Sequence, residues 1–304
     1  MTDVSPWFSE KMKTKVTHIR QARGKRLAGT TRRGDVKEKK VIFPIAGRGE
    51  AYKLTGAIQK VKPMNTNRQR VEVDMEDYEA SDWINRPDLH KLGPNEMDTV
   101  AQTVALAIGR QEDNIQWDAT AAFAATNTDV QTSGGATQNT TPQFFFGNKA
   151  GIKGHGDNAS YRIFVPLPEM NFEQLMLYKQ IASAEWKGPD DLPMLSRADM
   201  EVRQYRSVVF FTLPNEYFKN AAGAKLSDDT PPGDFFTYMW ADDALGVETN
   251  WDESAPSFSQ HHEYEGSPWL GKANVGGAAV GILGNGVRRL HLKTLAESDL
   301  TLPS

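Results

Sequence analysis

The chain has 304 residues, enough to bury a sizeable hydrophobic core, and its 39% hydrophobic and 24% charged residues are typical of a globular protein. It has no cysteine, which excludes disulfides, thiolate metal sites and cysteine nucleophiles and fits assembly in a reducing cytoplasm. The net charge of -4 is unevenly distributed, because residues 1–40 hold 12 basic and 4 acidic side chains and so carry +8, which leaves −12 on the remainder.

The first predicted element is a basic amphipathic helix in an N-terminal arm. Ser5 and Pro6 suit the N-cap and the first helical position. A narrow apolar stripe and two arginines follow: Phe8, Met12, Val16, Ile19, Arg23 and Arg26. Because an exposed helix is marginally stable alone, we expect these residues to dock on a neighbouring subunit. A helix packed on its own domain is the alternative.

Residues 39–76 predict a long β-hairpin. Val71, Val73 and Met75 alternate with acidic residues, which is the period of a strand with one covered face. A hairpin cannot bury both faces by itself, so its basic side chains indicate either a blunted edge or a clamp for an acidic surface. The basic residues in question are Arg48, Lys53, Lys60, Arg68 and Arg70.

An acidic segment ends this hairpin and continues to residue 85, where we expect a turn-rich corner anchored by Tyr78 and Trp83. In a neighbouring copy this corner would accept the basic hairpin. The acceptor residues are Glu72, Asp74, Glu76, Asp77, Glu79 and Asp82.

A very long helix is predicted over residues 94–124. Its apolar positions recur at steps of three, four and seven residues, and the core positions include Val100, Val104, Ile108 and Ile115. About 30 residues at ~1.5 Å each give a rod of ~45 Å, well above the mean helix length of about 11–12 residues.

The string DYEASDWINRPDLHKLGPNE, followed by a long helix that carries AIGRQEDNIQWDA, resembles the major capsid proteins of tailed double-stranded DNA bacteriophages. The resemblance implies the Johnson fold of the Hong Kong phage type: an α+β fold with an N-terminal arm, an extended β-hairpin loop, a long spine helix and interleaved peripheral and axial domains. The expected parts are an arm (1–38), the hairpin loop (39–76), a peripheral domain with the spine helix (77–165), a mainly axial domain (166–268), and return strands with a tail (269–304).

The rest of the chain gives shorter signals. Residues 126–141 read as a polar loop, whereas Phe144–Phe146 and Arg162–Val165 read as short strands. Asn171 would cap a helix from Phe172 to about Trp186, and residues 207–213 would form a strand covered on both faces. We expect residues 224–268 to be loop-rich. A closing hairpin would turn at Gly284-Asn285-Gly286.

No catalytic constellation is found. The run His261-His262-Glu263 lacks the H-E-x-x-H spacing, so a solvated loop is favoured over a metal site. The glycines at 281–286 lack the Lys-Ser/Thr of a phosphate loop. We therefore expect no catalytic residues, no metal and no cofactor, and a protein that is not an enzyme.

The resemblance implies a structural subunit of an icosahedral phage head, which self-assembles into hexamers and pentamers around double-stranded DNA without sequence specificity. It implies portal and scaffolding proteins as partners and allows a decoration protein. No apolar run approaches the ~18 residues of a membrane helix, so we expect a soluble protein located in the capsid shell and assembled in the bacterial cytoplasm. The alternative is a nucleic-acid-binding protein that uses the basic arm, although no recognition signature is present.

Overall fold

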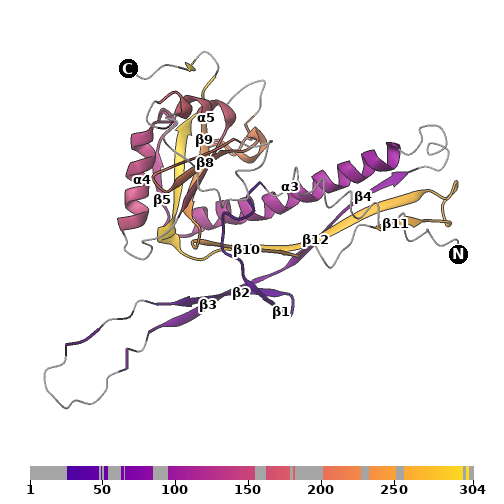
Figure 1. Ribbon diagram of the computed structural model, residues 1–304, viewed down its shortest axis with the longest axis horizontal. Coiled ribbons are helices and arrows are strands. Elements are labelled where there is room, and N and C mark those ends of the chain that lie inside the picture. Colours follow the sequence, from indigo (N-terminus) through magenta and orange to yellow (C-terminus); the bar gives the residue numbers. More distant parts are fainter. Residues whose placement is uncertain are drawn as a thin grey trace.

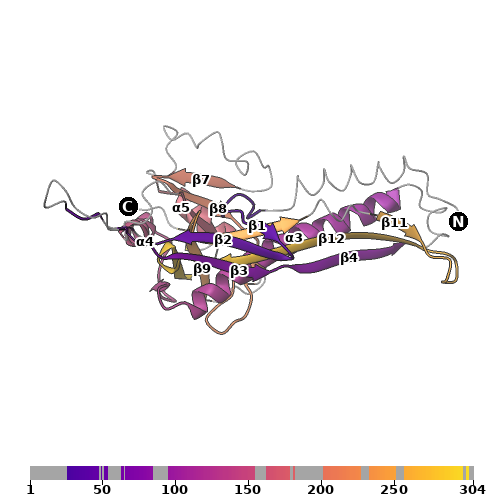
Figure 2. The ribbon, with the colours of Figure 1, turned by 90° about the horizontal axis from the view of Figure 1, so that it is seen from below.

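A computed structural model describes residues 26–47, 49, 51–53, 63–64, 66–84, 95–154, 162–178, 181, 201–226, 233–250, 257–296 and 299–300. The strands form three sheets: a hairpin sheet β1-β2-β3, a four-stranded sheet centred on β12, and a six-stranded sheet β5-β13-β9-β6-β8-β7. The four-stranded sheet and the long helix α3 form an elongated layer pair, and the six-stranded sheet sits at one end of it (Figures 1 and 2).

The elongated part is built on β12, which pairs with β10 and β11 along one edge and with β4 along the other. Its elements are β4 (Glu76–Ile84), α3 (Asn95–Thr126), β10 (Leu245–Asn250), β11 (Ser257–Gln260) and β12 (Trp269–Gly281). The predicted long helix is present, with 32 residues and a length of about 48 Å. Val100, Val104 and Ile108 are buried against β4 and β12, as the apolar period predicts, and Ile115 is half-buried.

Two glycines let α3 lie close to β12. A Cβ at Gly277 would lie 2.9 Å from Cδ1 of Ile115, and a Cβ at Gly281 would lie 2.0 Å from Cγ of Phe123. Four strand residues advance by about 13 Å and eight helix residues by about 12 Å, so the two side chains match the two glycines in spacing. The side chains of Ile115 and Phe123 therefore fill two notches in the strand.

The six-stranded sheet holds the largest hydrophobic core. Its elements are β5 (Gln131–Gly134), α4 (Pro142–Gly154), β6 (Ile163–Leu167), α5 (Glu169–Met176), β7 (Val202–Tyr205), β8 (Val208–Thr212), the 3-10 turn η2 (Asn215–Tyr217), β9 (Asp234–Ala241) and β13 (Val287–Lys293). Every residue of β6 and β8 is buried, which confirms the predicted strand over residues 207–213. The core is rich in aromatic rings, among them Phe145, Phe210 and Trp240.

The predicted hairpin over residues 39–76 is confirmed where the structure describes it. β1 (Asp35–Lys37) pairs with β2 (Lys40–Ala46), and β2 pairs with β3 (Arg68–Asp74) from Lys40 opposite Asp74 to Ala46 opposite Arg68. The pair points away from both larger sheets (Figure 1). Its base is held by Phe43, which is fully buried beside Val41 and Ala278.

The two larger sheets are joined through α3, which leads from β4 to β5, and by two short chain crossings. The chain passes from β9 to β10 through Ala244, and from β12 to β13 through Ile282, Leu283 and the 3-10 turn η3 (Gly284–Gly286). The carbonyl oxygen of Ala244 accepts hydrogen bonds from the backbone N–H of Ile282 at 2.8 Å and of Leu283 at 3.1 Å. The crossings are thus bonded to each other.

The predicted closing hairpin around Gly284-Asn285-Gly286 is wrong, because β12 and β13 belong to different sheets. The predicted loop-rich region 224–268 contains β9, β10 and β11, and the aromatic residues Phe235, Tyr238 and Trp240 of β9 pack into the core. Segment 126–141, predicted as a loop, holds the short strand β5, which pairs in parallel with β13.

The predicted strand at Phe144–Phe146 is wrong as well. These residues lie in α4, where Phe145 is buried and its two neighbours are half-buried, so packing against the sheet outweighs the β-propensity of phenylalanine. The helix predicted from Phe172 begins earlier, at Glu169, with Pro168 rather than Asn171 at the N-cap. The Asn171 amide instead donates to Thr140 Oγ1 and to the Lys293 carbonyl.

Candidate assembly surfaces

Some basic side chains of the hairpin form ion pairs with acidic side chains of the same hairpin. Lys53, Arg68 and Arg70 are exposed, whereas Arg48 and Lys60 lie outside the described residues. Arg70 forms an ion pair with Glu72 on the same strand, and Lys40 pairs with Asp74 at 3.6 Å. Exposed pairs of this kind contribute about 0–1 kcal/mol each, so they leave these side chains able to exchange partners.

The acidic residues do not form the turn-rich corner that the sequence predicts. Glu72 and Asp74 lie on β3, and Glu76, Asp77, Glu79 and Asp82 lie on β4. Exposed and half-buried residues alternate along β3 and again from Asp77 to Ala80, and the six carboxylates are strung over about 33 Å of extended chain. Tyr78 donates a hydrogen bond to Glu76, and this bond, with a smaller contribution from burial, raises the pKa of Tyr78.

The root of the N-terminal arm is fixed on α3 by a buried carboxylate. Asp113 accepts hydrogen bonds from the backbone N–H of Arg26 at 3.0 Å and of Leu27 at 2.9 Å. Thr30 continues this attachment, because its hydroxyl accepts from Gln116 Nε2 at 2.8 Å and its carbonyl accepts from Trp240 Nε1 at 3.0 Å. The arm is thus tied both to the long helix and to the six-stranded sheet.

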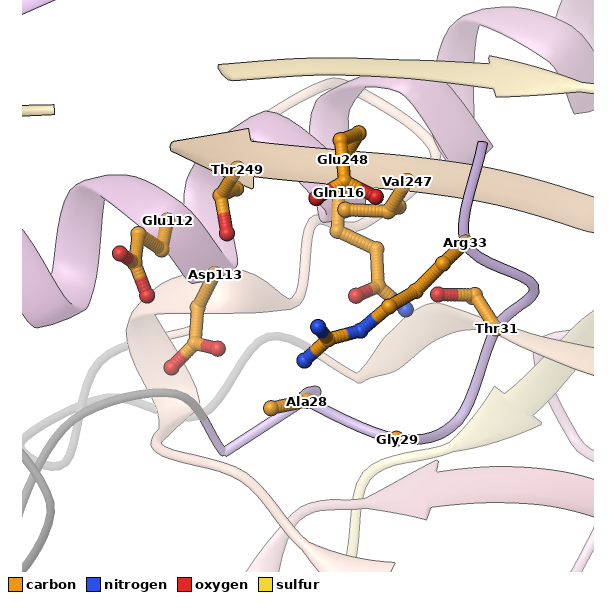
Figure 3. Close-up of a pocket in the computed structure, with 10 residues that line it drawn as sticks. All are labelled: Ala28, Gly29, Thr31, Arg33, Glu112, Asp113, Gln116, Val247, Glu248 and Thr249. Atoms are coloured by element: carbon orange, nitrogen blue, oxygen red, sulfur yellow. The ribbon is translucent and has the colours of Figure 1, made fainter. Parts of the chain in front are cut away.

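A small cavity of about 50 Å³ lies beside this root (Figure 3). The Arg33 side chain extends into it from the arm segment. Three acidic residues of α3 and β10 line it, namely Glu112, Asp113 and Glu248. The cavity is far smaller than the roughly 300–1,000 Å³ typical of a small-molecule site, so we interpret it as part of the arm attachment.

Sequence reasoning missed this attachment. Asp113 lies inside the string AIGRQEDNIQWDA, which carries the family resemblance, but it is not among the predicted functional residues. At 3.6 residues per turn Asp113 lies on the opposite side of the helix from Val100, Val104 and Ile108, so the apolar periodicity gives no signal for it. Of the residues predicted for arm docking, only Arg26 is described; Phe8, Met12, Val16, Ile19 and Arg23 lie outside the described residues.

Replacing Asp113 by asparagine is expected to lower the free energy of unfolding by about 2 kcal/mol, because one of the two buried N–H groups loses its charged acceptor. Asp118→Asn on the exposed face of the same helix is the matched control and should change stability by less than about 0.5 kcal/mol. Urea unfolding of both variants measures the difference. Equal stabilities would contradict the attachment.

An aromatic cluster occupies the far tip of the four-stranded sheet. The Trp83 ring makes edge contacts with His261 and Tyr264 at centroid distances of 5.2 and 5.4 Å. Trp83 is 46% exposed and Tyr264 55%, so Trp83 does not anchor a buried corner as the sequence suggests. His261 binds Glu263 and Ser259 instead of converging with its neighbours on one ion.

The two sheets, the long helix laid along one of them and the projecting hairpin define a class of protein: the fold is that of tailed-phage capsid subunits. The capsid protein of Ralstonia phage GP4 superposes with a TM-score of 0.62 at 11% identity, over 88% of this chain and 87% of that one. That of cyanophage Pam1 gives 0.57 at 12% identity, over 90% and 93% of the two chains. A virus-like particle from Pyrococcus furiosus gives 0.55 at 7% identity, over 92% and 98%.

The sequence pattern of the family described as "Phage capsid protein" matches residues 4–287, and the chain belongs to this family. It is a structural subunit of a phage capsid shell. No curated protein matches it in sequence. The comparisons give no support to the alternative of a nucleic-acid-binding protein. Among the described helices, none is long and apolar enough to cross a membrane.

Proposed function

We propose that this subunit builds the icosahedral head of a tailed phage from hexamers and pentamers that enclose double-stranded DNA. The observation that carries the proposal is the hairpin β2–β3. It projects from the body, its base is anchored there, and its described basic side chains are exposed. An element of this shape has few contacts of its own, so a neighbouring copy is its natural support.

In this proposal the four-stranded sheet with α3 is the peripheral domain and the six-stranded sheet is the axial domain. Membership of the sheets differs from the predicted ranges, because β5 and β6 join the six-stranded sheet and β10 and β11 the four-stranded one. The hairpin, through Arg48, Lys53, Lys60, Arg68 and Arg70, would lie across the acidic strand of the next copy. The arm would dock under a further neighbour.

The shell would be assembled in the bacterial cytoplasm with a portal and a scaffolding protein, and a decoration protein could bind the finished surface. The acidic body supports a shell that holds DNA loosely, since affinity for DNA rises with every phosphate that a basic side chain neutralises. Electron microscopy of the expressed chain, alone and with a scaffolding protein from the same phage, tests the proposal. Closed shells or rings of five and six are expected, and a monomer under all conditions would contradict it.

Replacing Arg68 and Arg70 by glutamate is expected to leave a folded subunit that forms few or no closed shells. The reversed side chains would face the acidic strand of the neighbour, and like charges in contact repel. Lys219→Glu with Lys225→Glu is the control, because it makes the same change in net charge on an exposed turn away from the hairpin. Shells counted by electron microscopy at equal protein concentration give the result; normal shell numbers from the hairpin variant would rule out the clamp.

A further inference from the structure

A cationic cluster stands at one end of the edge strand β7. Lys149 and Lys153 come from α4, and Arg206 comes from the turn between β7 and β8. The Lys149 ammonium donates to the Arg206 carbonyl, and the Arg206 guanidinium lies 5.8 Å from the Phe146 ring centre and 5.4 Å from that of Tyr205. In the described part of the chain no carboxylate forms an ion pair with these three cations.

The cationic side chains disfavour one another. Burial is the main cause that lowers the pKa of Lys149, and repulsion from Lys153 and Arg206 lowers it further. The turn itself is strained, because Arg206 and Ser207 have positive φ values of 48° and 68°. A two-residue hairpin turn with such φ values favours Asn-Gly. Arg206 thus presents its cationic side chain from a position where glycine would relieve the strain.

An acidic cluster stands at the other end of the same strand. Glu169 and Glu173 come from α5, Glu201 precedes β7, and their carboxylate oxygens lie within 4.8 Å of one another. Burial raises the pKa of Glu169, and the charges of Glu201 and Glu173 raise it further, against smaller opposing effects of Thr212 and Arg26. Five residues of extended chain separate Glu201 from Arg206, so the two clusters are about 16 Å apart.

From these two clusters we infer a contact between neighbouring copies in the same ring, in which the cationic cluster of one copy (Lys149, Lys153 and Arg206) meets the acidic cluster of the next (Glu169, Glu173 and Glu201). The inference rests on the proposed assembly into rings. Two different, complementary patches on one subunit make a head-to-tail contact, which closes into a ring when the rotation permits. The cationic cluster thereby gains counter-charges, and the acidic cluster gains cations beyond Arg26 of its own chain.

Two reversed variants test the contact. Lys153→Glu with Arg206→Glu makes the cationic cluster acidic, and Glu173→Lys with Glu201→Lys makes the acidic cluster basic. Each variant alone should give at least about ten-fold fewer rings and shells than the unchanged chain, because every contact then joins like charges. An equimolar mixture should recover six-membered rings, in which the two variants alternate, but not five-membered rings, since an odd ring cannot alternate.

The chain that carries both reversals should recover rings of both sizes. A pair of glycine substitutions separates charge from folding: Arg206→Gly and Ser207→Gly both relieve the turn and should raise the midpoint of thermal unfolding, but only Arg206→Gly should reduce ring yield. Ring sizes are counted by native mass spectrometry and electron microscopy.

Several outcomes would overturn the inference. Normal rings from either reversed variant would do so, as would recovery of two-subunit pairs rather than rings from the mixture. Loss of rings on chelation of divalent cations, with no effect of charge reversal, would assign the carboxylates to a metal ion instead. An unchanged chain that forms no ring or shell with scaffold would instead contradict the proposed function itself.

Discussion

Replacing Gly281 by valine is expected to lower the free energy of unfolding by about 3 kcal/mol or more. A Cβ at this position would lie 2.0 to 2.3 Å from three atoms of the Phe123 ring, which no rotation of that ring about its own axis relieves. The helix α3 must therefore move away from β12, and the packing along their shared length is weakened. Chemical denaturation of the purified subunit measures the loss.

Two further variants show whether the loss comes from the notch. Gly147→Ala adds a methyl group to α4 at a position with no atom within 4 Å, so it should be neutral or stabilising by up to about 1 kcal/mol. Combining Gly281→Val with Phe123→Ala should cost less than the sum of the two single changes, by about 0.5–3 kcal/mol, because the ring that clashes is absent. If the free-energy changes of the two single substitutions were strictly additive, the proposed clash between residue 281 and the Phe123 ring would be contradicted.

Replacing Phe43 by alanine is expected to cost about 3–5 kcal/mol and to release the hairpin from the body. The ring is fully buried, and a Cβ at Gly246 would lie 2.3 Å from its Cε1, so the ring is seated directly against the backbone of β10. Without it, the hairpin keeps its own ladder but loses its largest apolar contact with the four-stranded sheet.

Hydrogen exchange measures this release locally. In Phe43→Ala the amides of β2 and β3 should exchange at least about ten-fold faster, while those of the buried strands β6 and β8 keep their protection. Val36→Ala removes an apolar side chain that is 47% exposed on β1 and should change stability by no more than about 0.5 kcal/mol. Unchanged exchange in β2 and β3 would show that the hairpin is held elsewhere.

Regular patterns in the sequence predicted the parts of the fold in which local periodicity and burial agree. The long helix, the hairpin β2–β3 and the buried strand β8 are of this kind. The errors lie where tertiary contacts outweigh local preference. Phe144–Phe146 would suit a strand, but the sheet buries Phe145 as part of a helix, and the Gly-Asn-Gly turn passes the chain to another sheet rather than back along the same one.

The candidate site was less predictable than the fold. The charge pattern of the sequence indicated the basic hairpin and the acidic strand. That their residues contact each other between copies remains a prediction. The attachment of Arg26 and Leu27 to Asp113 joins positions 86 and 87 residues apart, which no local pattern reveals. The two charged clusters beside β7 likewise combine residues of α4 and α5 with the residues that flank the strand, so only the folded chain brings them together.

The position of the sheet-forming strands along the sequence also determines when a newly made copy can complete its fold. β12 is the central strand of the four-stranded sheet and β13 joins β5 to β9 in the other, yet both lie beyond residue 268. Since chains fold as they emerge from the ribosome, neither sheet is complete until residues 269–293 have been made. A chain that stops before residue 269 therefore carries the hairpin without either complete sheet, and so has no finished body to bring to the proposed shell.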